Sequence, residues 1–207
     1  MKKQRSLAAK GYKYADETEV KAAQLMTPEL ANIFGNIHGG HVMHFVDNIA
    51  FVCATRFART VCATVSIDRM DFHAPVHVGE LLHFVARINY VGRTSLQIEV
   101  EVSSENVTTG QVRHTNTSQL TFVALKNGKP TPVPRLTCRT REDKMCYLRA
   151  KMLREMGLRY RDEKNRVMGR FNHLGDKALD KLIAQDNIGR KSSEKKKTKD
   201  LPRNNLV

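Results

Sequence analysis

A pair of glycines opens the longest helical pattern in the chain. After Gly39 and Gly40, apolar residues recur at intervals of three and four, as they do on one buried face of an α-helix. They are Val42, Met43, Val46, Ile49, Ala50, Val52 and Cys53. The pattern predicts a helix that runs to about Arg59. Asp47 lies in its middle, where an unpaired buried carboxylate is costly, so Asp47 is a candidate functional residue.

Strand patterns precede and follow this helix. Residues 19–26 are apolar enough for a short strand, and Pro28–Ala31 suits a helical turn. After the helix, four segments are rich in β-branched residues or alternate between apolar and polar positions: 61–72, 81–90, 95–103 and 110–125. Their short connections imply antiparallel neighbours. A sheet that curls around the single helix would bury its apolar stripe, so we expect an α+β fold.

The chain changes character after Pro134. Apolar residues recur at helical spacing among Arg and Lys residues; they are Met145, Leu148, Met152, Leu153 and Met156, followed by a weaker set. One or two basic amphipathic helices are predicted here. The expected organisation is a flexible lead-in (1–18), a globular domain (19–137), a basic amphipathic helical extension (138–190) and a disordered basic tail (191–207).

The excess of positive charge lies at the two ends. Residues 1–18 contain five Lys and Arg against two Asp and Glu, residues 19–137 ten against nine, and residues 138–207 twenty against ten, for a net charge of +14. The middle is therefore nearly neutral. A basic extension can meet nucleic acid, an anionic membrane surface or a phosphorylated ligand, and its sign alone does not choose between them.

The cysteines and the apolar runs predict the compartment. The four cysteines form no CxxC pair, which favours reduced thiols. No apolar run approaches the roughly 20 residues that span a bilayer, and the start lacks a long apolar segment of the signal-peptide type. We therefore expect a cytoplasmic protein without a transmembrane segment.

The glycine pair also has a chemical interpretation. Free backbone N–H groups at a helix start, together with the positive end of the helix dipole, can hold a negatively charged or carbonyl oxygen. His41, His44 and Asp47 are spaced by three, but the usual zinc pair on a helix is spaced by four, with a remote third ligand. The sequence thus favours an oxyanion site at Gly39 and Gly40 and no metal.

The order of motifs resembles one family. Asn32 precedes Gly35, His38-Gly39-Gly40 follows, and Asp47 comes seven residues after the second glycine. Further matching segments are Val65–Phe72 with Pro75-Val76 and Gly79-Glu80, Val91–Ser95 leading into Gln97–Val102, and Thr121–Ala124. Over residues 19–137 the chain resembles the hotdog-fold acyl-CoA thioesterases, in particular the cytosolic acyl-CoA hydrolase group with its single-domain bacterial members.

The resemblance implies an antiparallel sheet wrapped around one long helix, a homodimer that assembles to a hexamer, and hydrolysis of fatty acyl-CoA to free fatty acid and coenzyme A. No cofactor is implied, because coenzyme A enters with the substrate. The family's catalytic Asp corresponds to Asp47, and the Asn that assists it from the facing subunit corresponds to Asn32. Asp47 could activate water or attack the thioester directly.

Each further site residue has a structural alternative. The resemblance suggests that Arg93, Thr94 and Ser95 line the path of the pantetheine or phosphates; otherwise Gly92-Arg93 is only a hairpin turn. Asn32 could equally cap a turn. His38 and His41 replace residues of bacterial relatives, which leaves His38 as a substrate-binding candidate and acyl-chain preference open.

A rival function is a non-catalytic hotdog domain that binds acyl-CoA as a sensor while its basic tail contacts nucleic acid. Residues 138–207 show no helix-turn-helix pattern, and a sensor would not need Asp47. A hotdog hydratase is disfavoured, because that chemistry pairs an Asp with a His a few residues downstream and no His follows Asp47 before His73.

Overall fold

The computed structural model describes residues 11–185 of the chain. It contains two compact units, one ending at Glu155 and the other beginning at Met156. The predicted disordered tail, 191–207, lies outside the described residues. In the described part of the chain, no helix is both long enough and apolar enough to cross a bilayer.

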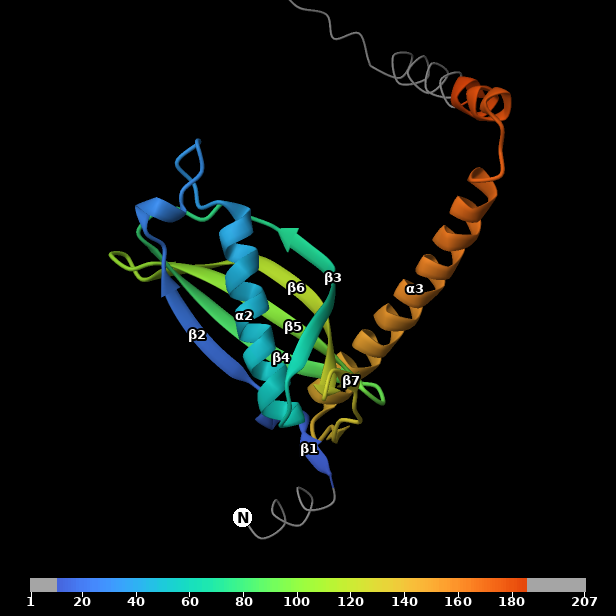
Figure 1. The fold of residues 1–207 in the computed structure, drawn as a ribbon. Helices are drawn as coiled ribbons and strands as arrows, with labels where there is room; N and C mark the ends of the chain where they lie inside the picture. Colours follow the sequence, from blue (N-terminus) through green and yellow to red (C-terminus); the bar gives the residue numbers. More distant parts are fainter. Residues whose placement is uncertain (1–10, 186–207) are drawn as a thin grey trace, which may run out of the picture. The chain divides into compact units, whose positions relative to one another are not determined.

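An antiparallel sheet forms most of the first unit (Figure 1). Its strands lie in the order β2-β4-β5-β6-β3, and a short β7 pairs with β6. The strands are β2 (Val20–Leu25), β3 (Cys62–Phe72), β4 (Glu80–Val91), β5 (Ser95–Asn106), β6 (Gln111–Lys126) and β7 (Lys129–Pro130). Every neighbouring pair in this sheet is antiparallel, as the short connections predict. β2 and β3 are the two edges.

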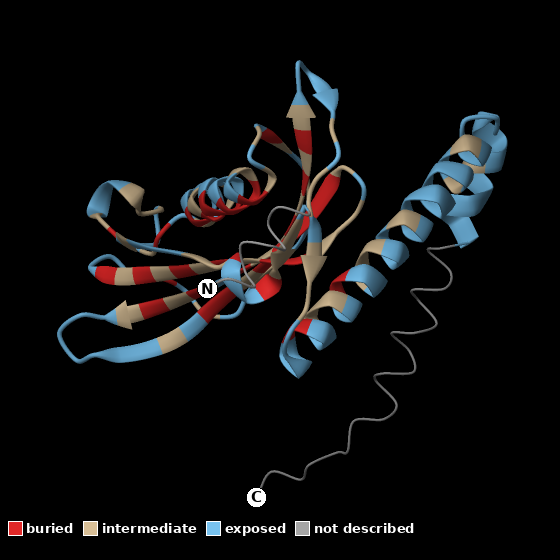
Figure 2. Ribbon diagram, turned by 90° about the horizontal axis from the view of Figure 1, so that it is seen from below, coloured by how far each residue is buried: buried red, intermediate tan, exposed pale blue. Residues whose placement is uncertain are grey.

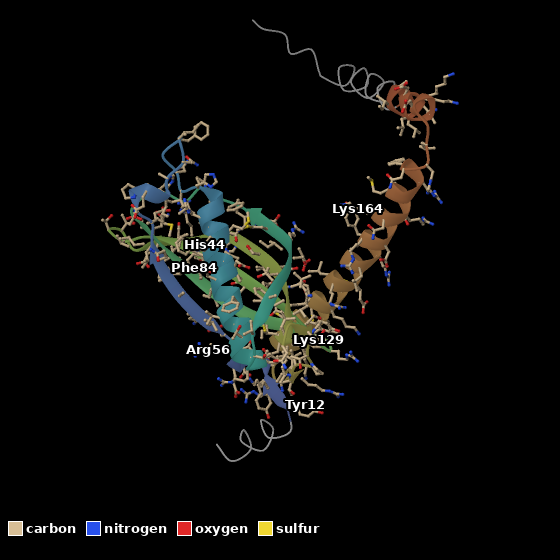
Figure 3. All side chains as sticks on the ribbon, viewed as in Figure 1. Tyr12, His44, Arg56, Phe84, Lys129 and Lys164 are labelled. Carbon is tan, nitrogen blue, oxygen red and sulfur yellow. The ribbon has the colours of Figure 1, made fainter. Side chains whose placement is uncertain are left out.

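The long helix α2 (Gly39–Ala58) packs across this sheet, and its buried side faces the strands (Figures 1 and 2). It ends at the left-handed C-cap Arg59, as the periodicity predicts. Its buried residues are Val42, Val46, Ile49, Ala50, Cys53, Ala54 and Phe57. They meet the alternating apolar faces of β4 and β5, including Phe84, whose ring lies 6.0 Å from that of Phe45 (Figure 3). The expected sheet curled around one helix is confirmed.

Two residues of the predicted apolar stripe are not part of this core. Met43 and Val52 are 38% and 41% exposed, whereas the seven buried residues of α2 are 6% exposed or less. The stripe is therefore narrower than the sequence suggests. At its exposed margin, Met43 lies four residues before Asp47 on the same face of the helix.

The segment before β2 is more structured than expected. Residues 11–18 fall within the predicted flexible lead-in, yet β1 (Tyr12–Tyr14) pairs in parallel with β8 (Arg135–Thr137), and the 3₁₀ turn η1 (Ala15–Glu17) follows. Lys13 Nζ donates hydrogen bonds to the carbonyls of Arg56 and Phe57 in the last turn of α2. A cation at a helix C-terminus stabilises the unpaired carbonyls, which attaches this segment to the fold.

The predicted helical extension is present. The helix α3 (Arg141–Phe171) follows β8, and residues 176–185 are also helical. Earlier in the chain, the predicted helical turn is the 3₁₀ turn η2 (Pro28–Leu30) before α2. α3 begins with a capping box: the Thr140 hydroxyl accepts from the Asp143 N–H at 3.0 Å, and Asp143 Oδ2 accepts from the N–H groups of Thr140 and Arg139 at 3.0 and 3.1 Å.

We predict that Asp143→Ala destabilises the first unit by about 1–2 kcal/mol, the typical value of a cap. Burial raises the pKa of Asp143, but hydrogen bonds from Thr140 and Arg139 outweigh it, so the pKa lies below its usual value. Because the pKa is lower in the folded state, Asp143 stabilises the fold at pH values above the unfolded pKa of about 3.9. This stabilisation is lost as the pH falls from there through the folded-state pKa. Urea unfolding at pH 7 and at pH 3 measures both effects. Asp162→Ala, an exposed acid on α3, should cost little at either pH. An equal loss in both variants would contradict the cap.

Candidate functional site

The start of α2 is built around Gly39, Gly40 and His38. His38 is the N-cap, and its Nδ1 accepts the Gly40 N–H at 2.9 Å. A Cβ at position 40 would lie 2.9 Å from that nitrogen, and one at position 39 would lie 3.4 Å from the Phe72 ring. The Gly39 N–H has no acceptor among the described residues. Gly39 is therefore the free donor here, and the Gly40 N–H becomes available only when His38 turns away.

Asn32 lies beside the same helix start. A cleft of about 390 Å³ is lined by Asn32, Asn36, Ile37, Gly39, Val42, Phe72, His73, Ala74, Pro75 and Val76. Asn32 Oδ1 accepts the N–H groups of Phe34 at 2.8 Å and Asn36 at 3.3 Å, so its carbonyl oxygen closes a turn. Its side-chain NH₂ group has no acceptor among the described residues. The structure thus brings together Asn32 and Gly39. The turn-capping alternative accounts for the Asn32 carbonyl oxygen but not for its NH₂ group.

Asp47 lies at the margin of the core. It is half-buried, and the Thr64 hydroxyl on β3 donates to its Oδ1 at 2.8 Å. Within residues 11–185, no Lys or Arg forms an ion pair with Asp47, so no structural ion pair accounts for this carboxylate. The pairing of β3 with β6 shifts register between Thr64 and Ser66. Bulges re-aim side chains and are frequent near active sites.

Thr64 is a candidate site residue that the sequence did not reveal. A threonine inside a β-branched run is ordinary strand composition, so its spacing carries no signal. The contact depends on the position of β3 beside α2, which pairs residues 17 positions apart. Only the docked helix and strand reveal it.

Within one chain, the predicted site residues do not all converge. Gly39 and Asp47 are eight residues apart on one helix, which places them about 12 Å apart along its axis. Arg93, Thr94 and Ser95 are farther still from Gly39. Ser95 pairs with Val123, which pairs in turn with Ala63 near the start of β3. Phe72, which lies beside Gly39, is at the opposite end of β3. In addition, Gly92 N–H donates to the Ser95 carbonyl at 2.8 Å, as in a hairpin turn.

Exposed apolar residues surround Asp47. Met43 and Phe51, four residues before and after it on the same helix face, are 38% and 41% exposed. The neighbouring edge strand β3 and the preceding segment expose Val61, Val65 and Ile67. At the tip of the Asn32 turn, Ile33 and Phe34 are 94% and 81% exposed. Three apolar surfaces thus adjoin the candidate residues, and the edge of the sheet is unpaired.

The remaining reactive side chains of α2 have structural partners. His44 Nε2 lies 3.1 Å from Asn48 Nδ2, and the His41 ring packs edge-on against His38 at 5.9 Å. His44 is labelled on α2 in Figure 3. Burial raises the pKa of Cys53 to about 12, so this thiol is not a nucleophile near neutral pH.

Sequence comparisons identify the family that this chain resembles. The sequence pattern of the Thioesterase superfamily matches residues 34–111. The chain is 39% identical over 145 residues to Protein VdlD of Helicobacter pylori, covering 70% of this chain and 83% of that protein. It is 34% identical to the uncharacterized acyl-CoA thioester hydrolase YkhA of Bacillus subtilis, covering 65% and 79%. The cytosolic acyl coenzyme A thioester hydrolase of Mus musculus is 32% identical, and the match covers 38% of that protein.

Solved structures give the same result. The acyl-CoA hydrolase from Staphylococcus aureus, in complex with butyryl coenzyme A, coenzyme A and coenzyme A disulfide, has a TM-score of 0.71 and 28% identity, covering 78% of this chain and 99% of that one. A hexameric acyl-CoA thioesterase has a TM-score of 0.70 and 33% identity, covering 72% and 96%. Variants of the S. aureus enzyme have been solved in which one Asp, one Asn or one Thr is replaced by Ala.

We predict that His38→Ala costs about 1 kcal/mol of stability, the typical value of a helix N-cap. Gly40→Ala should remove the same cap, because the new methyl group displaces the imidazole. In the Gly40→Ala background, His38→Ala should then cost almost nothing. A double-mutant cycle of urea unfolding measures this coupling. Additive costs would show that the bond does not hold the helix start.

Proposed function

The chain belongs to the acyl-CoA thioester hydrolases of the Thioesterase superfamily, and on this premise we propose that it hydrolyses fatty acyl-CoA to free fatty acid and coenzyme A with Asp47 as the reacting carboxylate. Thr64 orients Asp47, and Asn32 holds water or substrate. The Gly39 N–H, with the Gly40 N–H when His38 releases it, stabilises the oxyanion.

The contact between Thr64 and Asp47 carries this proposal. In the S. aureus variants, the replaced Asn precedes the Asp by 15 positions, and the Thr follows the Asp by 17. Asn32, Asp47 and Thr64 have the same two separations. Three residue types at matching intervals are far more specific than any one of them, and two of the three are in direct contact here.

The chemistry follows from the placement of the carboxylate. With Oδ1 held by Thr64, Oδ2 is free to take a proton from water as the water oxygen attacks the thioester carbon. The carbon–sulfur bond then breaks, and the proton passes to the departing thiolate. Alternatively, Oδ2 attacks the carbon itself, coenzyme A leaves, and water hydrolyses the resulting anhydride. In either route the developing oxyanion needs backbone donors, each typically worth about 2.7–4 kcal/mol.

A complete site requires two chains. One thioester carbonyl cannot contact both Asp47 and the Gly39 N–H of the same helix, about 12 Å away along its axis. A homodimer solves this when the unpaired edge β3 and the exposed residues around Asp47 pack against a second copy. Asn32 and Gly39 then act with the Asp47 of the facing chain. Pairing of dimers into a hexamer, as in the solved hexameric thioesterase, completes the proposed assembly.

The setting of the enzyme is part of the same proposal. We place it in the cytoplasm, in accord with the name of the cytosolic mouse relative. Residues 19–137 would form the thioesterase domain, and residues 138–190 an extension outside the catalytic machinery. Arg93, Thr94 and Ser95 would contact substrate only from a different chain than the one that supplies Gly39, and His38 would lie at the mouth of the oxyanion site.

We predict that the purified protein releases free coenzyme A from a panel of acyl-CoAs, measured with a thiol-trapping dye. Asp47→Asn should lower kcat about 10²–10⁴-fold, the usual contribution of a general base. Thr64→Val, which keeps the shape of the side chain, should lower kcat about 10–100-fold through misorientation of the carboxylate. Glu101→Gln, an exposed residue of β5, is the matched control and should be neutral. If the wild type releases no coenzyme A from any chain length, the enzyme proposal fails and the acyl-CoA sensor becomes the better hypothesis.

The two-chain site predicts complementation. Asn32→Ala and Asp47→Ala chains should each be nearly inactive alone. After denaturation and refolding together, half of the dimers are mixed, and each mixed dimer contains one site with both residues intact. About a quarter of wild-type activity should return, as follows from the exchange of residues across a two-fold axis. No recovery in a mixture shown by mass spectrometry to contain mixed dimers would place both residues in one chain.

A further inference from the structure

The helix α3 has one side that contacts the sheet. Ala150 is buried, the Tyr147 ring lies 5.1 Å from that of Tyr90 on β4, and Arg149 Nη2 donates to Glu99 on β5 at 3.1 Å. These contacts attach the first turns of α3 to the face of the sheet that α2 does not cover. The side of the helix that carries Ala150 is therefore packed against the sheet.

The apolar stripe of α3 points elsewhere. Leu148 and Met152 are each two residues from Ala150, which places them about 160° around the helix axis from it. They are 59% and 54% exposed, whereas Met145, 60% exposed, lines a cleft between α3 and the sheet together with Val85 and Arg87. In a helix that packed by its apolar stripe, these would be the buried residues. Instead Ala150 and Tyr147 meet the sheet, and Leu148 and Met152 are exposed.

Cations flank this stripe. Around it, the first unit exposes Arg141, Lys144 and Lys151, whereas Arg149 is paired with Glu99 on the sheet. The exposed acids on the same turns are Glu142 and Glu155, and each has a cation within 4.0 Å, Arg87 and Lys151 respectively. In the second unit, considered by itself, Met156 and Tyr160 are 56% and 72% exposed beside Arg159 and Arg161. The combination of exposed apolar residues and surrounding cations therefore occurs in each unit, taken by itself.

The chemistry of the stripe selects its partner. A second copy of α3 laid against the first would bring rows of Lys and Arg together, which is unfavourable. Nucleic acid would satisfy the cations through its phosphates but would not bury methionine and leucine. An anionic lipid surface does both: its headgroups attract the cations, and the boundary of its acyl chains receives the apolar side chains.

We propose that Leu148 and Met152 of α3, with the flanking Arg and Lys residues, form a reversible binding surface for an anionic lipid bilayer. The helix lies in the plane of the interface without crossing it, in accord with the lack of a spanning helix in the described part of the chain. This surface is separate from Asp47 and does not depend on the proposed hydrolysis.

Flotation of the full-length protein with vesicles tests this surface. It should float with phosphatidylcholine vesicles that contain about 30% phosphatidylglycerol, bind pure phosphatidylcholine at least tenfold less, and lose binding as salt rises from about 0.1 M to 1 M. The double substitution Leu148→Ser with Met152→Ser should reduce binding to anionic vesicles about tenfold. Val107→Ser with Val112→Ser is the matched control: both residues are exposed and lie on the hairpin between β5 and β6, away from α3, so binding should persist.

The thermal unfolding midpoint of each variant is measured in parallel, so that loss of binding is compared only between folded proteins. Equal binding to neutral and anionic vesicles, or undiminished binding by the Leu148/Met152 variant, would overturn the proposal. So would a lower oligomeric mass of that variant in light scattering, because the stripe would then be an interface between copies. Salt-sensitive binding of duplex DNA with no binding to vesicles would assign the cations to nucleic acid instead.

Discussion

The burial of one side of α2 against the sheet is the constraint on which the rest of the structure depends. Val46, Ala50 and Ala54 are fully enclosed by apolar residues of β4, β5 and β6. Because the side-chain period of a strand is two, one register of each strand presents these apolar residues to the helix. With the rotation of α2 fixed in this way, every other residue of the helix has its direction assigned. Asp47 falls on the boundary beside β3, where a threonine hydroxyl can reach it.

The same constraint separates the parts of the proposed active site. The helix start supplies a backbone donor, and its middle supplies a carboxylate, but the rise of the helix keeps them about 12 Å apart. A rigid helix locked in a core cannot bend to close that gap. The proposed remedy is symmetry, in which a second copy would bring its own helix start to the first copy's carboxylate. The unpaired edge β3 and the exposed Met43 and Phe51 are the surfaces that such a pairing would cover.

The sequence predicted the elements whose pattern is periodic and missed those whose order depends on remote contacts. The helix from Gly39 and the strands with alternating residues follow from local spacing. β1 has three residues and no periodicity, and it is held by pairing with β8 and by Lys13 at the end of α2, more than 40 positions away. Thr64 was not predicted for the same reason, because its contact with Asp47 joins residues 17 positions apart. Asn32 and Gly39 could be placed together because they are close in the chain, whereas no pattern reveals how far apart Gly39 and Ser95 lie.

The helix α3 shows why an amphipathic pattern does not by itself identify the packed side. The periodicity of Met145, Leu148 and Met152 predicted the helix correctly, and the usual expectation is that such a stripe faces the protein. Here the outer face of the sheet is polar, with Glu99 and Gln97 on β5, so the favourable contacts for α3 were an ion pair, an aromatic pair and a small buried Ala150. Polar chemistry on the sheet selected the polar side of the helix. The apolar side was left exposed by that choice, and an exposed stripe ringed by cations is the composition of a helix that binds the surface of a bilayer.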